Sequence, residues 1–150
     1  MAQHEWSIQR CTVADAAALG ENNASAFWTD GSWRQMWPLC TLSPFVVEQV
    51  TKRLPRNLLT DRAKLRHQKA VDPATGEVVG YARWILPPSR AGDEWWPEAQ
   101  VPDVGDDEKA AFGELAGSAW WHFRGDDTPL DIAMGKIKDR MLAEREYMGN

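Results

Sequence analysis

Aromatic side chains are the residues of this chain best suited to contact a ligand. The sequence contains nine tryptophans, each a large rigid ring with a single N–H donor, a residue type common in cores, pockets and interfaces. Because ligand pockets are mostly apolar with few polar groups, such rings would suit a flat or apolar small molecule. The alternative is that they only cover a sheet. The candidate substrate-binding residues are Phe27, Trp28, Trp33, Trp37 and Trp84.

Titratable side chains give weaker patterns. His67 lies in a basic segment, but a general base also needs a reachable proton and a group that orients its imidazole. His122 precedes Asp126 and Asp127 at a spacing that matches no metal-ligand pattern. The sequence has no nucleophile-elbow, zinc-protease or phosphate-loop motif. We therefore assign no catalytic residue and expect no metal site.

Composition excludes several classes of partner. A formal net charge of -5 and a pI of about 5.2 argue against a nucleic-acid-binding protein. No apolar run approaches the roughly 18 residues that would span a membrane, and the first residues lack a signal-peptide pattern. Cys11 and Cys40 form no C-x-x-C motif, so both are expected to be free thiols. We expect a cytoplasmic protein without a membrane or nucleic-acid partner.

Charge is segregated along the chain. Basic residues gather between Lys52 and Lys69, and acidic residues gather between Asp93 and Asp107. A solvated helix face followed by an acidic loop is the simplest interpretation. Attraction of an anionic ligand to the basic stretch is the alternative.

Local patterns predict the elements that must position these residues. Residues 5–11 alternate as a strand, and Thr12 with Asp15 resembles a capping box that starts a helix. Ser43 and Pro44 fit the N-cap and first position of a second helix. Pro55 is expected to end this helix or to start a second short turn.

The second half of the chain is predicted to contain a hairpin, an irregular segment and two helices. Strands over 64–72 and 77–86 are joined by a turn from Asp72 to Gly76. Residues 87–107 are expected to be irregular, with a helical turn near 94–99. A helix capped by Asp106 or Asp107 follows, and then a last helix capped by Thr128 with Pro129 at its first position.

A glycine inside the second hairpin strand needs an explanation. Both faces of residues 77–86 are largely apolar, which is typical of a central strand. We therefore expect a helix or a bound substrate to pack closely over Gly80. The element order predicts an α/β (α+β in looser usage) fold, with a short antiparallel sheet flanked by helices in a single domain over 1–150.

This order resembles the N-terminal half of the GCN5-related N-acetyltransferase (GNAT) family, in particular its fungal small-molecule members. The segment "IQRCTVADAAALGENNASAF" is similar to the family's first strand and helix, with Ile8, Arg10 and Asp15 at favoured positions. The segment "GEVVGYARWILP" is similar to its third strand. The resemblance covers residues 5–87, and covers 88–150 only weakly, as an acidic loop and helical extension. It implies acyl transfer from acetyl-CoA to a small-molecule amine, with the first two helices and their connection lining the acceptor pocket.

The part of the family that binds acetyl-CoA has no counterpart in this sequence. The resemblance implies a bulged fourth strand and a Gln/Arg-x-x-Gly-x-Gly/Ala loop, whose backbone N–H groups cradle the pyrophosphate at a helix N-terminus. The glycines at 113–117 and 124–127 lack that spacing. No cofactor-binding residue is therefore assigned, and the chain is expected to be inactive alone and to be an incomplete domain.

Two other functions remain open. The chain could be a repurposed small-molecule-binding protein or a non-CoA enzyme of secondary metabolism. It could also be a structural protein that dimerises, because the strand over 77–86 would lack its fourth-strand neighbour and sheet edges are normally covered or paired. We expect either coverage by a helix over 129–147 or edge-to-edge pairing in a homodimer.

Overall fold

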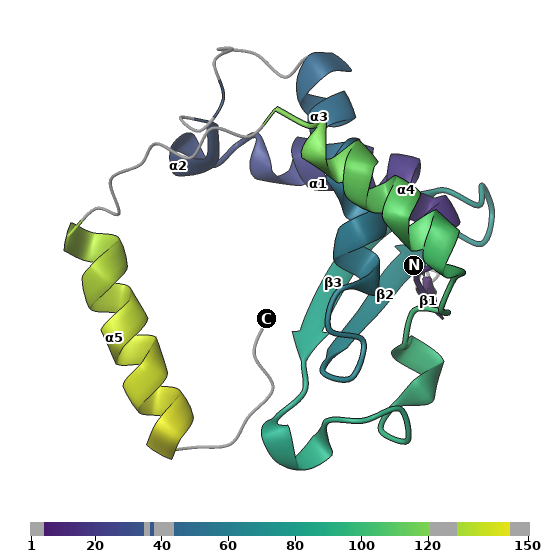
Figure 1. Ribbon diagram of the computed structural model, residues 1–150. Helices are drawn as coiled ribbons and strands as arrows, with labels where there is room; N and C mark the ends of the chain where they lie inside the picture. Colours follow the sequence, from purple (N-terminus) through teal and green to yellow (C-terminus); the bar gives the residue numbers. More distant parts are fainter. Residues whose placement is uncertain (1–4, 35–36, 38–43, 121–128, 145–150) are drawn as a thin grey trace.

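The computed structural model describes residues 5–34, 37, 44–120 and 129–144, and it confirms a mixed α+β fold (Figure 1). Three 3-10 turns accompany the main elements: η1 (Val13–Asp15), η2 (Pro88–Arg90) and η3 (Pro97–Ala99). The helices and strands follow in the order β1 (Ser7–Arg10), α1 (Ala16–Phe27), α2 (Gly31–Arg34), α3 (Pro44–Leu59), β2 (Leu65–Val71), β3 (Val78–Ile85), α4 (Asp106–Gly117) and α5 (Pro129–Glu144).

The sheet is antiparallel with the strand order β1-β2-β3. Ala70 of β2 pairs with Ile8 on one side and with Gly80 on the other, and His67 pairs with Arg83. The ladder between β2 and β3 shifts its register between Ala70 and Val71. Within the described residues β3 pairs only with β2, so its outer edge carries unpaired backbone groups.

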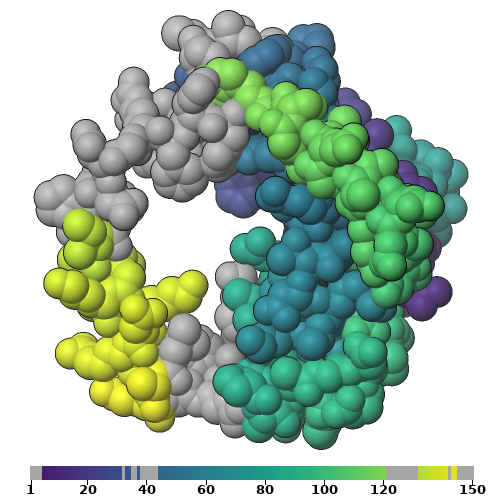
Figure 2. All heavy atoms as spheres, in the orientation of Figure 1, coloured from purple at the N-terminus to yellow at the C-terminus, as the bar shows by residue number. Residues whose placement is uncertain are grey.

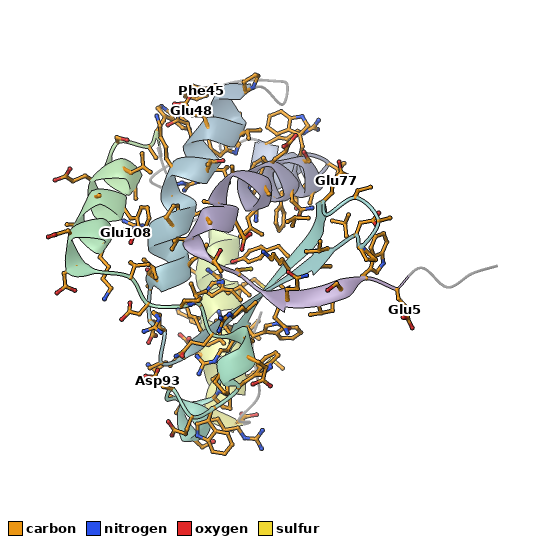
Figure 3. All side chains as sticks on the ribbon, turned by 90° about the vertical axis from the view of Figure 1, so that its right-hand side faces the viewer. Glu5, Phe45, Glu48, Glu77, Asp93 and Glu108 are labelled. Carbon is orange, nitrogen blue, oxygen red and sulfur yellow. The ribbon has the colours of Figure 1, made fainter. Side chains whose placement is uncertain are left out.

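Helices α1 and α3 cover one face of the sheet, and α4 lies on the outer side of α3 (Figures 1 and 2). Figure 3 shows this layering from the side, with Glu108 of α4 and Glu77 of the β2–β3 turn at opposite sides of the molecule. The core lies between the two helices and the sheet. Its buried apolar members are Cys11, Ala16, Leu19, Ala24, Trp37, Val46, Val50, Leu54, Leu58 and Val101.

The junction from β1 to α1 forms as predicted. The Thr12 amide donates to Asp15 Oδ2 at 2.7 Å, which satisfies a donor at the start of the helical segment. The Lys69 ammonium lies 2.6 Å from the other Asp15 oxygen, in a largely buried ion pair. This contact fixes the beginning of α1 to the middle strand.

Two predicted helix boundaries are wrong. Pro55 lies inside α3, which continues to Leu59, because Leu54 and Leu58 on either side are buried in the core. That burial offsets the backbone hydrogen bond that proline removes. The N-cap of α4 is Gly105, and Asp106 already lies within the helix.

Two other expectations for the second half of the chain are met. Helix α5 begins at Pro129, and η3 supplies the helical turn expected near 94–99. Four predictions concern residues outside the described ones: the Thr128 cap, the Cys40 thiol, the Ser43 N-cap and the group around His122. Cys11 is a free, buried thiol.

The surroundings of Gly80 differ from the prediction. A Cβ placed there would meet only the Ala70 Cβ, at an ordinary contact distance of 3.5 Å. No described helix packs closely over this glycine. The close neighbour is instead the small side chain across the ladder, so the strand tolerates Gly80 and does not require it.

An extended segment after β3 covers the opposite face of the sheet. Arg66 of β2 is fully buried, and its Nε donates to the carbonyls of Trp95 and Trp96 at 3.0 and 3.1 Å. Its Nη2 donates to the Gly92 carbonyl at 2.6 Å, and its Nη1 to the Arg62 carbonyl at 2.6 Å. One guanidinium thus holds the irregular segment onto the strand.

Helix α5 stands apart from the sheet in Figure 1, and no helix covers the outer edge of β3 among the described residues. The expected coverage by residues 129–147 is therefore not found in the part of that range that is described. None of the described helices is both long enough and apolar enough to cross a membrane.

The contact between α1 and α3 gives a first testable prediction. A Cβ at Gly20 would meet Thr51 Oγ1 and would lie 3.1 Å from the Thr51 Cα. Gly20→Ala should therefore lower the free energy of unfolding by about 2 kcal/mol, because the helices must separate. This loss outweighs the gain of about 1 kcal/mol in helix propensity. Urea denaturation followed by tryptophan fluorescence measures it.

Gly80→Ala is the matched control. Its added methyl group meets only the Ala70 side chain, so the substitution should be neutral or stabilising by up to about 1 kcal/mol. Equal losses for both variants would contradict the close approach at Gly20.

Candidate ligand-binding cavity

A cavity of about 650 Å³ opens between the first helices and the hairpin strands. Helix α1 forms one wall, α3 forms another, and β2 with β3 forms the floor. The lining residues are Asn22, Asn23, Ala26, Phe27, Val50, Arg53, Leu54, Asn57, His67, Tyr81, Ala82, Arg83 and Trp84.

Helical periodicity explains the α3 wall. Val50, Arg53, Leu54 and Asn57 follow the i, i+3, i+4, i+7 spacing that places side chains on one helix face. The two apolar members are buried in the core, and the two polar members extend the same stripe into the cavity. The wall is therefore the polar margin of the surface that packs α3 onto the sheet.

A buried histidine–tyrosine pair forms part of the floor. His67 of β2 is 1% exposed, and its Nδ1 lies 2.8 Å from the Tyr81 hydroxyl of β3. The rings stack with centroids 6.0 Å apart. His67 Nε2 and Trp84 Nε1 are buried and have no hydrogen-bond partner within the described part of the chain.

Burial keeps this pair neutral. Desolvation, followed by the positive charges of Arg83 and Arg66, lowers the pKa of His67 to about 4. Desolvation and then the neighbouring Cys11 raise the pKa of Tyr81 to about 12, against an opposing effect of Arg83. Desolvation and then Asp15 raise the pKa of Cys11 to about 12, so this thiol is poorly nucleophilic at neutral pH.

The structure separates the predicted aromatic residues into two groups. Phe27 and Trp84 line the cavity, Phe27 with about half of its surface exposed. Trp28, Trp33 and Trp37 are not among its lining residues. The assignment of these five residues to substrate binding stays a prediction.

The other tryptophans form a continuous row of ring contacts against the core. Trp33 lies 6.1 Å from Phe27, 5.9 Å from Trp28 and 5.4 Å from Trp37, measured between ring centroids. Trp37 is 5.6 Å from Trp120, which follows α4. This row joins the segment after α1 to the end of α4, and its partly buried rings pack against the core.

Sequence reasoning missed most polar lining residues. Asn22, Asn23 and Asn57 belong to no motif, and Arg53 was visible only as part of a basic stretch. The usable signal was positional: Tyr81 and Arg83 alternate onto the face of β3 that also carries Ile85. Other cations of the basic stretch have structural roles: Arg62 pairs with Asp103 at 3.3 Å, and Lys69 pairs with Asp15.

The N-termini of α3 and α4 do not fit the pyrophosphate of acetyl-CoA. A pyrophosphate site at a helix N-terminus needs free backbone N–H groups and no nearby anions. The first turn of α4 instead carries Asp106, Asp107 and Glu108, and α3 begins with Pro44, which has no N–H. In the described ranges no cluster of three or more His, Cys, Asp or Glu side chains could hold a metal ion.

Comparison with known proteins gives no identification. No family model, curated protein sequence or solved structure matches this chain.

Proposed function

We propose that this chain forms the acceptor-binding part of an N-acetyltransferase related to the GNAT family, and that another segment or polypeptide binds acetyl-CoA. The observation that carries the proposal is the cavity between α1, α3 and the hairpin strands, where the resemblance implies that the acceptor amine binds. The strand order β1-β2-β3, with helices inserted between β1 and β2, supports it.

The outer edge of β3 supports the same proposal. An edge strand with unpaired N–H and C=O groups can accept a further strand by main-chain hydrogen bonds. In the proposed enzyme, the strand added beside β3 carries the groups that bind acyl-CoA. A second copy of the chain is the alternative occupant, which would give a homodimer.

The proposal is tested with the product of the complete coding region. This product should release free thiol from acetyl-CoA in the presence of small amines, whereas residues 1–150 should not. Ala26→Trp should abolish the release, because Ala26 lines the cavity and the larger side chain would fill it. Ala18→Trp, exposed on the same helix, is the matched control and should retain activity.

Two outcomes would overturn this function. One is the absence of thiol release by the complete product over a panel of arylamines and alkylamines. The other is micromolar binding of acetyl-CoA to residues 1–150 alone, measured by isothermal titration calorimetry.

A second function, small-molecule binding without acyl transfer, is favoured by the acidic first turn of α4, which would repel the cofactor. It predicts that the complete product binds amines in the cavity and releases no thiol. The thiol assay therefore distinguishes the two functions.

A further inference from the structure

The charged side chains that line the cavity are all positive. Arg53 and Arg83 are its two ionised lining groups at neutral pH, and no Asp or Glu is among the lining residues of the described chain. The remaining polar lining is dominated by amides, which can donate as well as accept hydrogen bonds. The whole protein has a formal net charge of -5, so the cavity is a positively charged region of an acidic protein.

Arg83 is placed to bind an anion. It lies directly opposite His67 in the ladder, on the face of β3 that bears Tyr81. Its side chain is exposed, and no hydrogen bond or ion pair joins it to another described residue. Arg83 lines the cavity, and its charge contributes, after burial, to the lowered pKa of His67. A planar guanidinium matches the geometry of a carboxylate.

Arg53 lies in the α3 wall of the same cavity. Its Nε donates to the Gln49 carbonyl at 3.3 Å, one turn earlier in the helix. The side chain is half-buried, and desolvation, followed by the charge of Arg56, lowers its pKa. Arg53 therefore adds a second positive charge to the cavity wall, and its interaction with an anion in the cavity would be stronger than in bulk water.

The rest of the cavity suits a flat apolar group. Phe27 presents about half of its ring surface, and Leu54 and Trp84 add apolar area. Rings of this kind favour stacked or edge contacts with an aromatic ligand. Positive and aromatic surfaces therefore occur in one cavity.

We propose that this cavity binds a small aromatic carboxylate, whose carboxylate group is held by Arg53 and Arg83 and whose ring packs against Phe27. If the proposed function holds, this ligand is also the acyl acceptor, an aromatic amine that carries a carboxylate. That statement rests on the proposed function. The binding itself does not, because it requires no acetyl-CoA.

The test uses residues 1–150 and two probes that differ only in the carboxylate, 4-aminobenzoate and aniline. Isothermal titration calorimetry should show 4-aminobenzoate binding at least about tenfold more tightly than aniline. Arg83→Gln and Arg53→Gln should each weaken 4-aminobenzoate about tenfold and leave aniline unchanged. Added salt should reduce the preference, since the interaction is between ions.

Arg56→Gln is the matched control. Arg56 is exposed on the same helix as Arg53 and does not line the cavity, so its loss should change affinity less than about twofold. Circular dichroism of each variant verifies that it is folded, and Arg83 is exposed, so its substitution leaves the core intact.

Equal affinity for the two probes would overturn the proposal, and so would unchanged affinity in the Arg83→Gln variant or no saturable binding of 4-aminobenzoate at millimolar concentration. Carboxylate binding together with an absence of thiol release by the complete product would overturn the acyltransferase function alone. Thiol release with aniline as efficient as with 4-aminobenzoate would overturn the carboxylate assignment alone.

Discussion

Replacing Arg66 by methionine should lower the free energy of unfolding by at least about 3 kcal/mol. The side chain is fully buried, and its guanidinium donates to carbonyl oxygens of Arg62, Gly92, Trp95 and Trp96. Hydrogen bonds from charged donors contribute about 1.5–3 kcal/mol each, and a buried acceptor left without a donor costs about 1–3 kcal/mol. Methionine has similar length but donates no hydrogen bond, so several of these carbonyls would lose their donor.

Equilibrium denaturation in urea, followed by far-UV circular dichroism, measures this loss. Arg10→Met is the matched control, because Arg10 lies exposed on the neighbouring strand β1 and should change stability by less than about 0.5 kcal/mol. The variant should also make the segment 88–104 more sensitive to proteolysis, since the guanidinium holds it to the sheet. A loss equal to that of the control would contradict the anchoring role.

Lowering the pH from about 7.5 to about 5 should cost about 2 kcal/mol of stability through His67 alone. The pKa of this histidine is about 4 in the folded chain, against 6.5 for an unperturbed histidine. The unfolded chain therefore binds more protons between these values, so the free energy of unfolding falls as the pH drops through 6.5. The loss levels off near about 3 kcal/mol once the pH is below the folded pKa.

His67→Asn supplies the comparison. Asparagine can place a polar atom near the position of Nδ1, which lies beside the Tyr81 hydroxyl, but it does not titrate in this range. Urea denaturation at a series of pH values should show a slope for the natural chain and a much flatter curve for the variant. The ion pair of Asp15 with Lys69 is lost only at lower pH. Burial raises the pKa of Asp15, but the hydrogen bonds from Lys69 and Thr12 and the Lys69 charge together outweigh burial and hold the pKa below its usual value. Parallel curves for the two proteins would contradict a neutral, buried His67.

Local signals in the sequence predicted most of the fold. The Thr12–Asp15 capping box and the Asp72–Gly76 turn act within a few residues, and both form. Pro55 was misjudged because a local rule ends helices at proline, whereas burial of Leu54 and Leu58 against distant residues keeps α3 helical. Gly80 was misjudged because an apolar pattern cannot show which neighbour fills the space.

The cavity was less predictable. Phe27 and Trp84 were expected to bind a ligand, and both line the cavity. Arg53, Asn57 and Arg83 also line the cavity, but only because folding brings their elements together. No short motif marks such residues, since α1, α3 and β3 meet only after folding. The local signals available were the mixed apolar and polar stripe on α3 and the alternation of Tyr81 and Arg83 on β3.

The row of rings from Phe27 to Trp120 gives the chain a built-in optical signature. Indole rings held 5.4–5.9 Å apart in fixed, differing orientations couple their electronic transitions. The folded protein should accordingly show an intense near-ultraviolet circular dichroism signal. That signal should vanish in any compact state that keeps its helices but loses fixed side-chain packing. Native packing of these rings against the core can thus be followed without an added label.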